Sequence, residues 1–256
     1  MLIPLLKTRH VEITDLGELH WLLGIEIRRD HEKCAIYLSQ RSYIDSILCH
    51  YNLQDLKPIS TPMETHVKLS TSRSPATTVQ FAQMCDIPYH EAVRSLMYAS
   101  LGTRPNILFA IQTLSHFSTK PGIAHWEAVK RVFRYLKGTA DLWVSYGQKK
   151  VELTGYADAD GSMAEDRYAI SGYAFIIHGG AVSWSAKCQE IVLLSTTESE
   201  YIAATHAAKD ALWLRSLIQQ LFDTTLSPTT LYSDNQSAIA LTKDNQYHVC
   251  TKHINI

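Results

Sequence analysis

The chain has 256 residues, of which 46% are apolar and 19% charged, a balance typical of a globular protein with a sizeable core. Its 24 basic and 25 acidic residues give a net charge of -1, which by itself argues against a polyanion-binding protein. No apolar run approaches the roughly 20 residues of a membrane helix, and no signal peptide is evident. Five scattered cysteines without a C-x-x-C pair suit reduced thiols, so we expect a cytoplasmic or nuclear protein.

The first half begins with strand patterns and continues with helical ones. Residues 21–28 and 35–38 are β-rich and flank a polar turn, which predicts a hairpin. Apolar positions at three- and four-residue steps predict a helix over 40–53. Residues 54–87 contain prolines and many Ser and Thr residues, which favours an extended connector. Further helices are predicted over 89–100, 105–117 and 124–136.

The last of these helices carries a basic face opposite its apolar one. The cations are Lys130, Arg131, Arg134 and Lys137. They could form the solvated side of a core helix, or they could contact the phosphates of a nucleic acid. Both interpretations stay open from the sequence.

The pattern changes near residues 147–150. Strands are predicted over 151–158, 171–178 and 181–185, with a tight turn at His178-Gly179-Gly180. A long helix over 195–222, with room for one break, precedes a strand over 229–233 and a helix over 235–242. This order predicts a mixed α/β sheet with helices on its faces. We therefore expect an α/β protein with two domains, residues 1–147 and 148–256.

Three acids of the second half occupy chemically suggestive positions. Asp158 ends a predicted strand, Glu200 lies in the first turns of the long helix, and Asp234 follows the later strand. Each alone is common as a cap or helix-dipole partner. Together they predict carboxylate ligands for Mg²⁺ or Mn²⁺, with two ions acting on a phosphodiester. Periodicity alone does not choose between Asp158 and Asp160, or between Glu200 and Glu198.

Longer motifs carry a family resemblance. The second half contains GYADAD, SGYAFIIHGGAVSWSAKCQEIVLLSTTESEYIAATHAAKDALWL and YSDNQSAIAL. The first half contains TDLGELHWLLGIEI, LSQRSYIDSIL, YHEAVRSLMYASLGTRPNILFAIQTLSHF and HWEAVKRVFRYLKGT. From about residue 12 onward the chain resembles copia-type LTR-retrotransposon Pol polyproteins, in the segment that joins reverse transcriptase to RNase H.

The resemblance implies an α+β connector, the thumb- or connection-like end of reverse transcriptase, followed by an RNase H-like domain. That domain would have the element order β-β-β-α-β-α. Asp158, Glu200 and Asp234 then correspond to three of four catalytic, metal-binding acids, and the family pattern favours them over Asp160 and Glu198. The implied substrate is an RNA–DNA hybrid, of which the RNA strand is cut.

The departures from the family pattern limit these expectations. The polymerase motif Tyr-x-Asp-Asp does not occur in the chain, so we expect no polymerase activity from it. In relatives a last strand and a helix with the fourth acid follow Lys252-His253-Ile254. We therefore expect a truncated domain with an impaired second metal site and an open sheet edge that invites self-association.

Two other functions compete with nuclease activity: a non-catalytic nucleic-acid-binding module, or a decayed retroelement remnant without independent function. A zinc site at His248, Cys250 and His253 lacks a second ligand pair, so zinc is not expected.

The net charge divides unevenly at the proposed boundary. Residues 1–150 hold 18 basic and 13 acidic residues, and residues 151–256 hold 6 and 12. The first part therefore carries +5 and the second -6. The near-zero net charge argued against binding to a polyanion, but this uneven division reverses that inference. The basic part could bind phosphates while the acidic part gathers cations.

Overall fold

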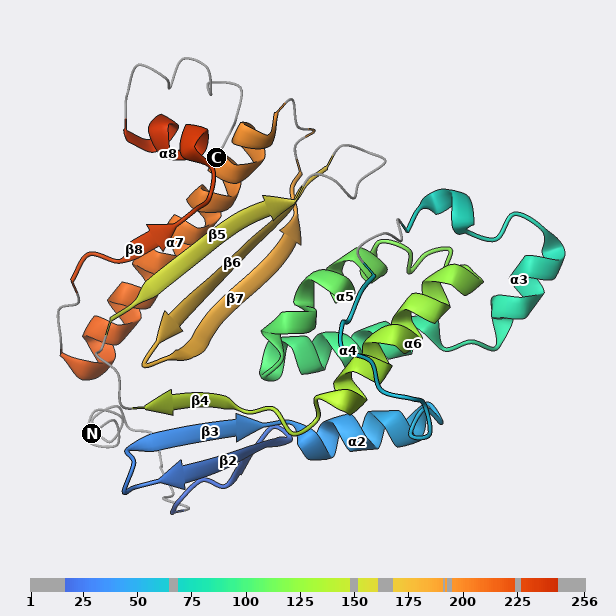
Figure 1. Cartoon of the computed structure of the whole chain (residues 1–256), viewed down its shortest axis with the longest axis horizontal. Coiled ribbons are helices and arrows are strands. Elements are labelled where there is room, and N and C mark those ends of the chain that lie inside the picture. Colours follow the sequence, from blue (N-terminus) through green and yellow to red (C-terminus); the bar gives the residue numbers. More distant parts are fainter. Residues whose placement is uncertain are drawn as a thin grey trace, which may run out of the picture.

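The computed structural model describes residues 17–64, 69–147, 152–160, 168–190, 192, 195–223 and 227–243. Within these residues the chain forms two four-stranded sheets and seven α-helices (Figure 1). The predicted mixed α/β class is therefore confirmed. None of the helices in this part of the chain has the length and apolar character needed to cross a membrane.

The first sheet is antiparallel throughout, with the strand order β1-β2-β3-β4. Its strands are β1 Trp21–Leu22, β2 Ile25–Asp30, β3 Ala35–Ser39 and β4 Val144–Gly147. The single strand predicted over 21–28 is wrong, because the chain reverses at Leu23 and Gly24. Their φ angles of 50° and 74° match a two-residue hairpin turn. The short strand β4 was not predicted.

The helices of the first half are α2 Arg41–His50, α3 Thr78–Cys85, α4 Tyr89–Gly102, α5 Leu108–Ser115 and α6 Ile123–Gly138, with 3-10 turns η1 Thr71–Arg73 and η2 Pro105–Ile107. Helices α2, α4, α5 and α6 bury their apolar faces against one another, as the periodicity predicts. Helix α3 lies where an extended connector was predicted. A capping box between Thr77 and Gln80 starts it, a local signal that the surrounding prolines obscured.

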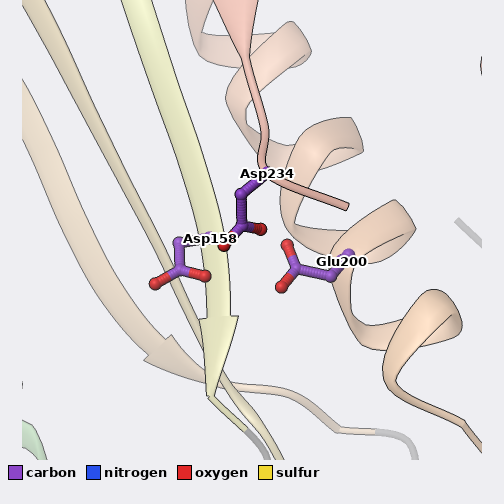
Figure 2. Close-up of side chains that lie close together, drawn as sticks. All are labelled: Asp158, Glu200 and Asp234. Atoms are coloured by element: carbon purple, nitrogen blue, oxygen red, sulfur yellow. The ribbon is translucent and has the colours of Figure 1, made fainter. Parts of the chain in front are cut away.

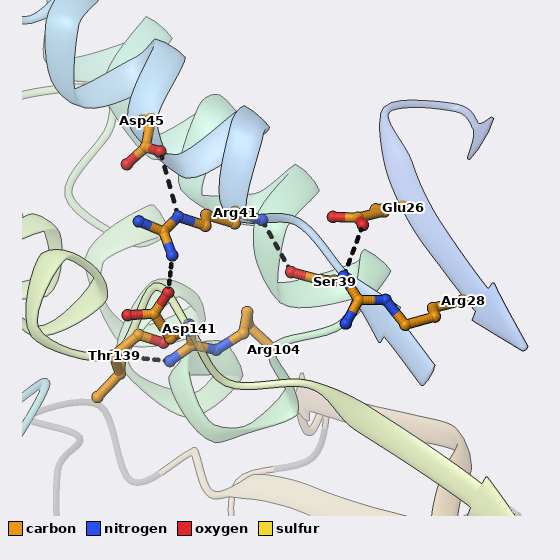
Figure 3. A network of polar contacts seen from close by, with 8 residues as sticks. All are labelled: Glu26, Arg28, Ser39, Arg41, Asp45, Arg104, Thr139 and Asp141. Carbon is orange, nitrogen blue, oxygen red and sulfur yellow. Dashed lines mark hydrogen bonds and ion pairs between the residues drawn. The ribbon is translucent and has the colours of Figure 1, made fainter. Parts of the chain in front are cut away.

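Buried Arg104 fixes the end of α6 against the turn after α4 (Figure 3). Its guanidinium donates to the carbonyl oxygen of Thr139 at 2.8 Å and to the hydroxyl of the same residue. At the start of α2, Arg41 pairs with Asp45 at 3.8 Å and also with Asp141. These bonds hold the segment that leads from α6 into β4.

The second sheet has the strand order β7-β6-β5-β8. Its strands are β5 Thr154–Asp160, β6 Ile170–Ile177, β7 Gly180–Cys188 and β8 Thr230–Tyr232. Strand β5 pairs antiparallel with β6 and parallel with β8. The tight turn between β6 and β7 is confirmed, since His178 and Gly179 have φ angles of 51° and 84°.

One face of this sheet is covered by α7 Thr196–Phe222, a single unbroken helix, and α8 Gln236–Lys243 follows β8 (Figure 1). Buried Ala203, Ala207 and Ala211 recur every four residues along α7. Side chains this small let the helix lie close to the sheet, where Phe175 fills the core.

The edge strand β4 of the first sheet lies against the turn between β6 and β7 of the second sheet (Figure 1). Three donors cross between the parts to carbonyl oxygens: Gly147 N–H to His178 at 3.1 Å, the Tyr146 hydroxyl to Ala181 at 2.5 Å, and the Trp184 indole to Ser100 at 2.9 Å. The contacts leave no room beside Gly180. A Cβ atom there would lie 2.5 Å from the Tyr146 ring and 2.6 Å from the Ser145 carbonyl oxygen.

We predict that Gly180→Ala lowers the free energy of unfolding by about 1–3 kcal/mol, the cost of forcing a methyl group into a packed site. Gly172→Ala is the matched control, because its nearest neighbours would lie at 3.8 Å. Urea denaturation of both variants measures the difference. Equal midpoints would show that the junction does not contribute to stability.

The first half also contains a buried, neutral histidine. His125 accepts the N–H of Gly122 on Nδ1 at 2.9 Å, and its Nε2 lies 3.2 Å from the carbonyl oxygen of Ser70. Burial, with Arg73 nearby, lowers its pKa below the usual value of 6.5. Protonation on Nδ1 would also remove the acceptor of Gly122.

The unfolded chain takes up this proton at a higher pH than the folded chain does. The contribution of His125 to the free energy of unfolding should therefore be complete above pH 6.5 and decrease as the pH falls below that value. We expect a lower melting temperature at about pH 5.5 than at about pH 7.5. His125→Gln should be less stable at the higher pH and lose less on acidification. An undiminished pH effect in this variant would assign the effect to other groups.

Candidate metal centre

Three carboxylates converge beside the second sheet (Figure 2). Asp158 belongs to β5, Glu200 to the second turn of α7, and Asp234 to the segment between β8 and α8. One oxygen of each lies within 4.8 Å of the others. The structure thus brings together the three acids that the sequence singled out.

Strand register explains why the two aspartates lie side by side. Strands β5 and β8 are parallel, and Tyr156 is paired with Tyr232. Asp158 and Asp234 each follow their tyrosine by two residues, so the chain that continues past the end of β8 places Asp234 beside Asp158 of β5. The tyrosine rings stack at 5.3 Å between centroids, which supports this register.

Glu200 enters the centre from the opposite side. The side chain of Ser195 caps α7 by accepting the N–H of Glu198 at 3.3 Å, and this sets where the helix begins. Glu200 is only 7% exposed, whereas Asp158 and Asp234 are exposed. Within the described part of the chain, its buried Oε2 atom has no hydrogen-bond partner.

The electrostatics of Glu200 follow from this position. Burial first, then the nearby charges of Asp158 and Asp234, raise its pKa from 4.5 to about 7. The N–H of Ala159 opposes the shift, but it also donates to Asp158 at 2.9 Å. Ionising Glu200 at this position therefore costs more than ionising an exposed glutamate.

The donor set fits a hard divalent cation. All three residues offer carboxylate oxygens, the ligands that Mg²⁺ and Mn²⁺ prefer. A buried oxygen without a hydrogen bond and a cluster of like charges are both compensated by a bound cation. The arrangement could therefore hold such an ion.

The alternatives considered from the sequence lie outside this cluster. Asp160 follows on the same strand and Glu198 precedes Glu200 on the same helix. Among the described residues, neither belongs to the cluster of acids that could hold a metal ion. His248, Cys250 and His253 lie outside the described residues.

The centre is reachable from the open face of the sheet. One hollow of about 500 Å³ contains both aspartates and both stacked tyrosines. A second, of about 380 Å³, lies between Asp158 and the residues of η2 and α5. Both are lined largely by apolar atoms.

The four cations of α6 have partners within the chain. Lys130 pairs with Glu127 at 2.6 Å and Arg131 with Glu64 at 2.5 Å. The other two donate to main-chain oxygens: Arg134 to Lys57 at 2.7 Å and Lys137 to Leu56 at 2.9 Å. Together, Arg131, Arg134 and Lys137 hold the segment over residues 56–64 against the helix.

Sequence reasoning missed one buried polar residue near the centre. Gln189 follows β7 and is 4% exposed, with its side chain between β6 and α7. A single glutamine after a strand has no periodic signal. Only the spatial contacts distinguish it from a surface residue.

Several known proteins are similar to this chain. It is 42% identical over 252 residues, 97% of its length, to the Retrovirus-related Pol polyprotein from transposon TNT 1-94 of Nicotiana tabacum. It is 35% identical over 253 residues, 96% of its length, to that from transposon RE2 of Arabidopsis thaliana. The chain spans only 19% and 16% of these relatives. An uncharacterized mitochondrial protein of Arabidopsis thaliana is 33% identical over 202 residues, which is 78% of this chain and 80% of that protein. No family model matches the chain, and no solved structure matches it significantly.

We predict that Glu200→Gln stabilises the metal-free protein at about pH 8, where the buried carboxylate would otherwise be ionised beside two aspartates. The expected gain is about 1–3 kcal/mol, the order of the extra cost of ionising a carboxyl group whose pKa is about 7 instead of 4.5. Thermal denaturation in the presence of a chelator measures it. Glu198→Gln should change stability by less than about 0.5 kcal/mol. Destabilisation by Glu200→Gln alone would contradict repulsion at the centre.

Proposed function

Because the chain belongs to the family of copia-type retrotransposon Pol polyproteins, we propose that its second half is an RNase H-type domain. In this proposal it hydrolyses the RNA strand of an RNA–DNA hybrid. The observation that carries the proposal is the convergence of Asp158, Glu200 and Asp234 within 4.8 Å. Residues 1–147 would be the C-terminal part of the reverse transcriptase.

The topology of the second sheet supports this assignment. Three antiparallel strands are followed by a helix, a parallel strand beside β5, and another helix. This is the β-β-β-α-β-α order expected for an RNase H-like domain. The acids then lie where the central strand, its parallel neighbour and the covering helix meet.

Asp158, Glu200 and Asp234 would hold Mg²⁺ or Mn²⁺. When bound, such an ion supplies positive charge to the phosphate and lowers the pKa of attacking water. The exposed aspartates would face the substrate, and buried Glu200 would anchor the centre from the helix side. The hollows beside Asp158 leave the scissile phosphate a route to these oxygens.

The proposal is limited to hydrolysis. The chain contains no Tyr-x-Asp-Asp motif and corresponds to under a fifth of the two Pol polyproteins compared above. A phosphate-binding role for Lys130, Arg131, Arg134 and Lys137 is not included, because these cations bond to the chain itself.

Cleavage of a fluorescently labelled RNA–DNA hybrid in Mg²⁺ or Mn²⁺ tests the proposal. Asp158→Asn and Asp234→Asn should each reduce the rate by more than the roughly 10- to 100-fold that loss of an outer-shell partner costs. Asp223→Asn at the far end of α7 removes the same charge at an exposed, left-handed position that asparagine tolerates, so its rate should not change. Cleavage that survives the double aspartate variant would refute the assignment.

A further inference from the structure

The side-chain amide of Gln189 makes two hydrogen bonds in the interior of the second half. Its Nε2 atom donates to the hydroxyl of Ser171 at 2.6 Å and to the carbonyl oxygen of Ser199 at 2.9 Å. Both serines are buried, with exposures of 4% and 1%. An amide nitrogen carries two hydrogens, so these two bonds use its full donor capacity.

One acceptor pairs with the residue after Asp158, and the other directly precedes Glu200 in the chain. Ser171 in β6 is paired with Ala159, the residue after Asp158. Ser199 precedes Glu200 in α7, and its carbonyl group belongs to the peptide unit that joins the two. A single amide nitrogen thus links the sheet beside Asp158 to the helix beside Glu200.

The main chain holds the amide in place. The N–H of Gln189 donates to the carbonyl oxygen of Ala169 at 2.8 Å, which continues the pairing of β6 with the end of β7. The side chain therefore projects from a fixed backbone position and bonds to both elements.

The Gln189 side chain also destabilises the fold in one respect, which good packing does not require. Its Oε1 atom is buried and has no hydrogen-bond partner in the described part of the chain. An unsatisfied buried acceptor destabilises the fold, and an apolar residue of similar volume would avoid that loss. A specific requirement for the two donated bonds accounts for an amide at this position.

We infer that Gln189 is a positioning residue, whose amide sets the distance between the carboxylates of Asp158 and Glu200. The inference rests on the proposed metal centre. It assigns Gln189 no contact with the ion or substrate, and its influence passes through the backbone of β6 and α7.

Binding of Mn²⁺ alone to the full chain, followed by electron paramagnetic resonance, tests this role. Gln189→Leu keeps the approximate volume and removes both bonds. We expect the Kd for Mn²⁺ to rise at least about tenfold, as for the loss of other outer-shell partners. The melting temperature of the metal-free protein should change little, because the unsatisfied oxygen disappears with the bonds.

Gln40→Leu is the matched control. Gln40 is also buried, at 1% exposure, and accepts a hydrogen bond from Thr103 at 2.8 Å, but it lies in the first half. This variant should leave the Kd unchanged. Ser171→Ala removes one of the two acceptors with less change in volume, so it should raise the Kd even if the leucine variant does not fold.

The outcomes separate the two proposals. If Asp158→Asn weakens Mn²⁺ binding but Gln189→Leu and Ser171→Ala do not, the positioning role is overturned and the metal centre stands. If Asp158→Asn leaves Mn²⁺ binding unchanged, the centre itself fails and the role of Gln189 fails with it. If Gln40→Leu raises the Kd for Mn²⁺ as much as Gln189→Leu does, the effect comes from general destabilisation of the fold, and the inference is overturned.

Discussion

Mutual repulsion of three carboxylates is the constraint that the second half of this protein must satisfy. Two like charges about 5 Å apart repel by about 3 kcal/mol at an effective dielectric constant of about 20. The cluster keeps its oxygens within 4.8 Å despite this force, so the backbone must impose the geometry. Burial first, and then the charges of Asp158 and Asp234, raise the pKa of Glu200 to about 7.

The backbone imposes this geometry through elements that are themselves firmly packed. Parallel pairing of β5 with β8 brings two acids together, and α7 brings the third across the sheet. The alanine-lined face of α7 allows the close approach, and the amide of Gln189 ties the start of the helix to β6. The first half supports the same sheet at one end, through bonds from β4 to the β6–β7 turn and to the start of β7. The acids therefore depend on contacts well outside their own segments.

The sequence predicted the elements whose signals are local and periodic. The amphipathic helices and the turn at His178-Gly179 could be read directly, because hydrophobic spacing and turn residues are local properties. The choice of Asp158 over Asp160 and of Glu200 over Glu198 came from the family resemblance instead. Strand β4 is short, and it is a strand only because β3 lies beside it. Gln189 was missed for the same reason, since its role exists only where β6 and α7 meet. The cations of α6 show the converse. Their clustering was visible in the sequence, but the partners of Arg131, Arg134 and Lys137 lie some 70 to 80 residues away along the chain.

The bonds of Arg134 and Lys137 also constrain the sequence of α6 more than the sequence of the connector that α6 holds. Arg134 and Lys137 bond to the carbonyl oxygens of Lys57 and Leu56, which every amino acid possesses. These bonds therefore place no demand on the side chains of the connector, whose sequence can drift while its path stays fixed. The demand falls entirely on α6, where a long donor side chain is needed at both positions. Divergent copies should thus retain basic residues on the helix longer than they retain any particular sequence in the segment that it holds.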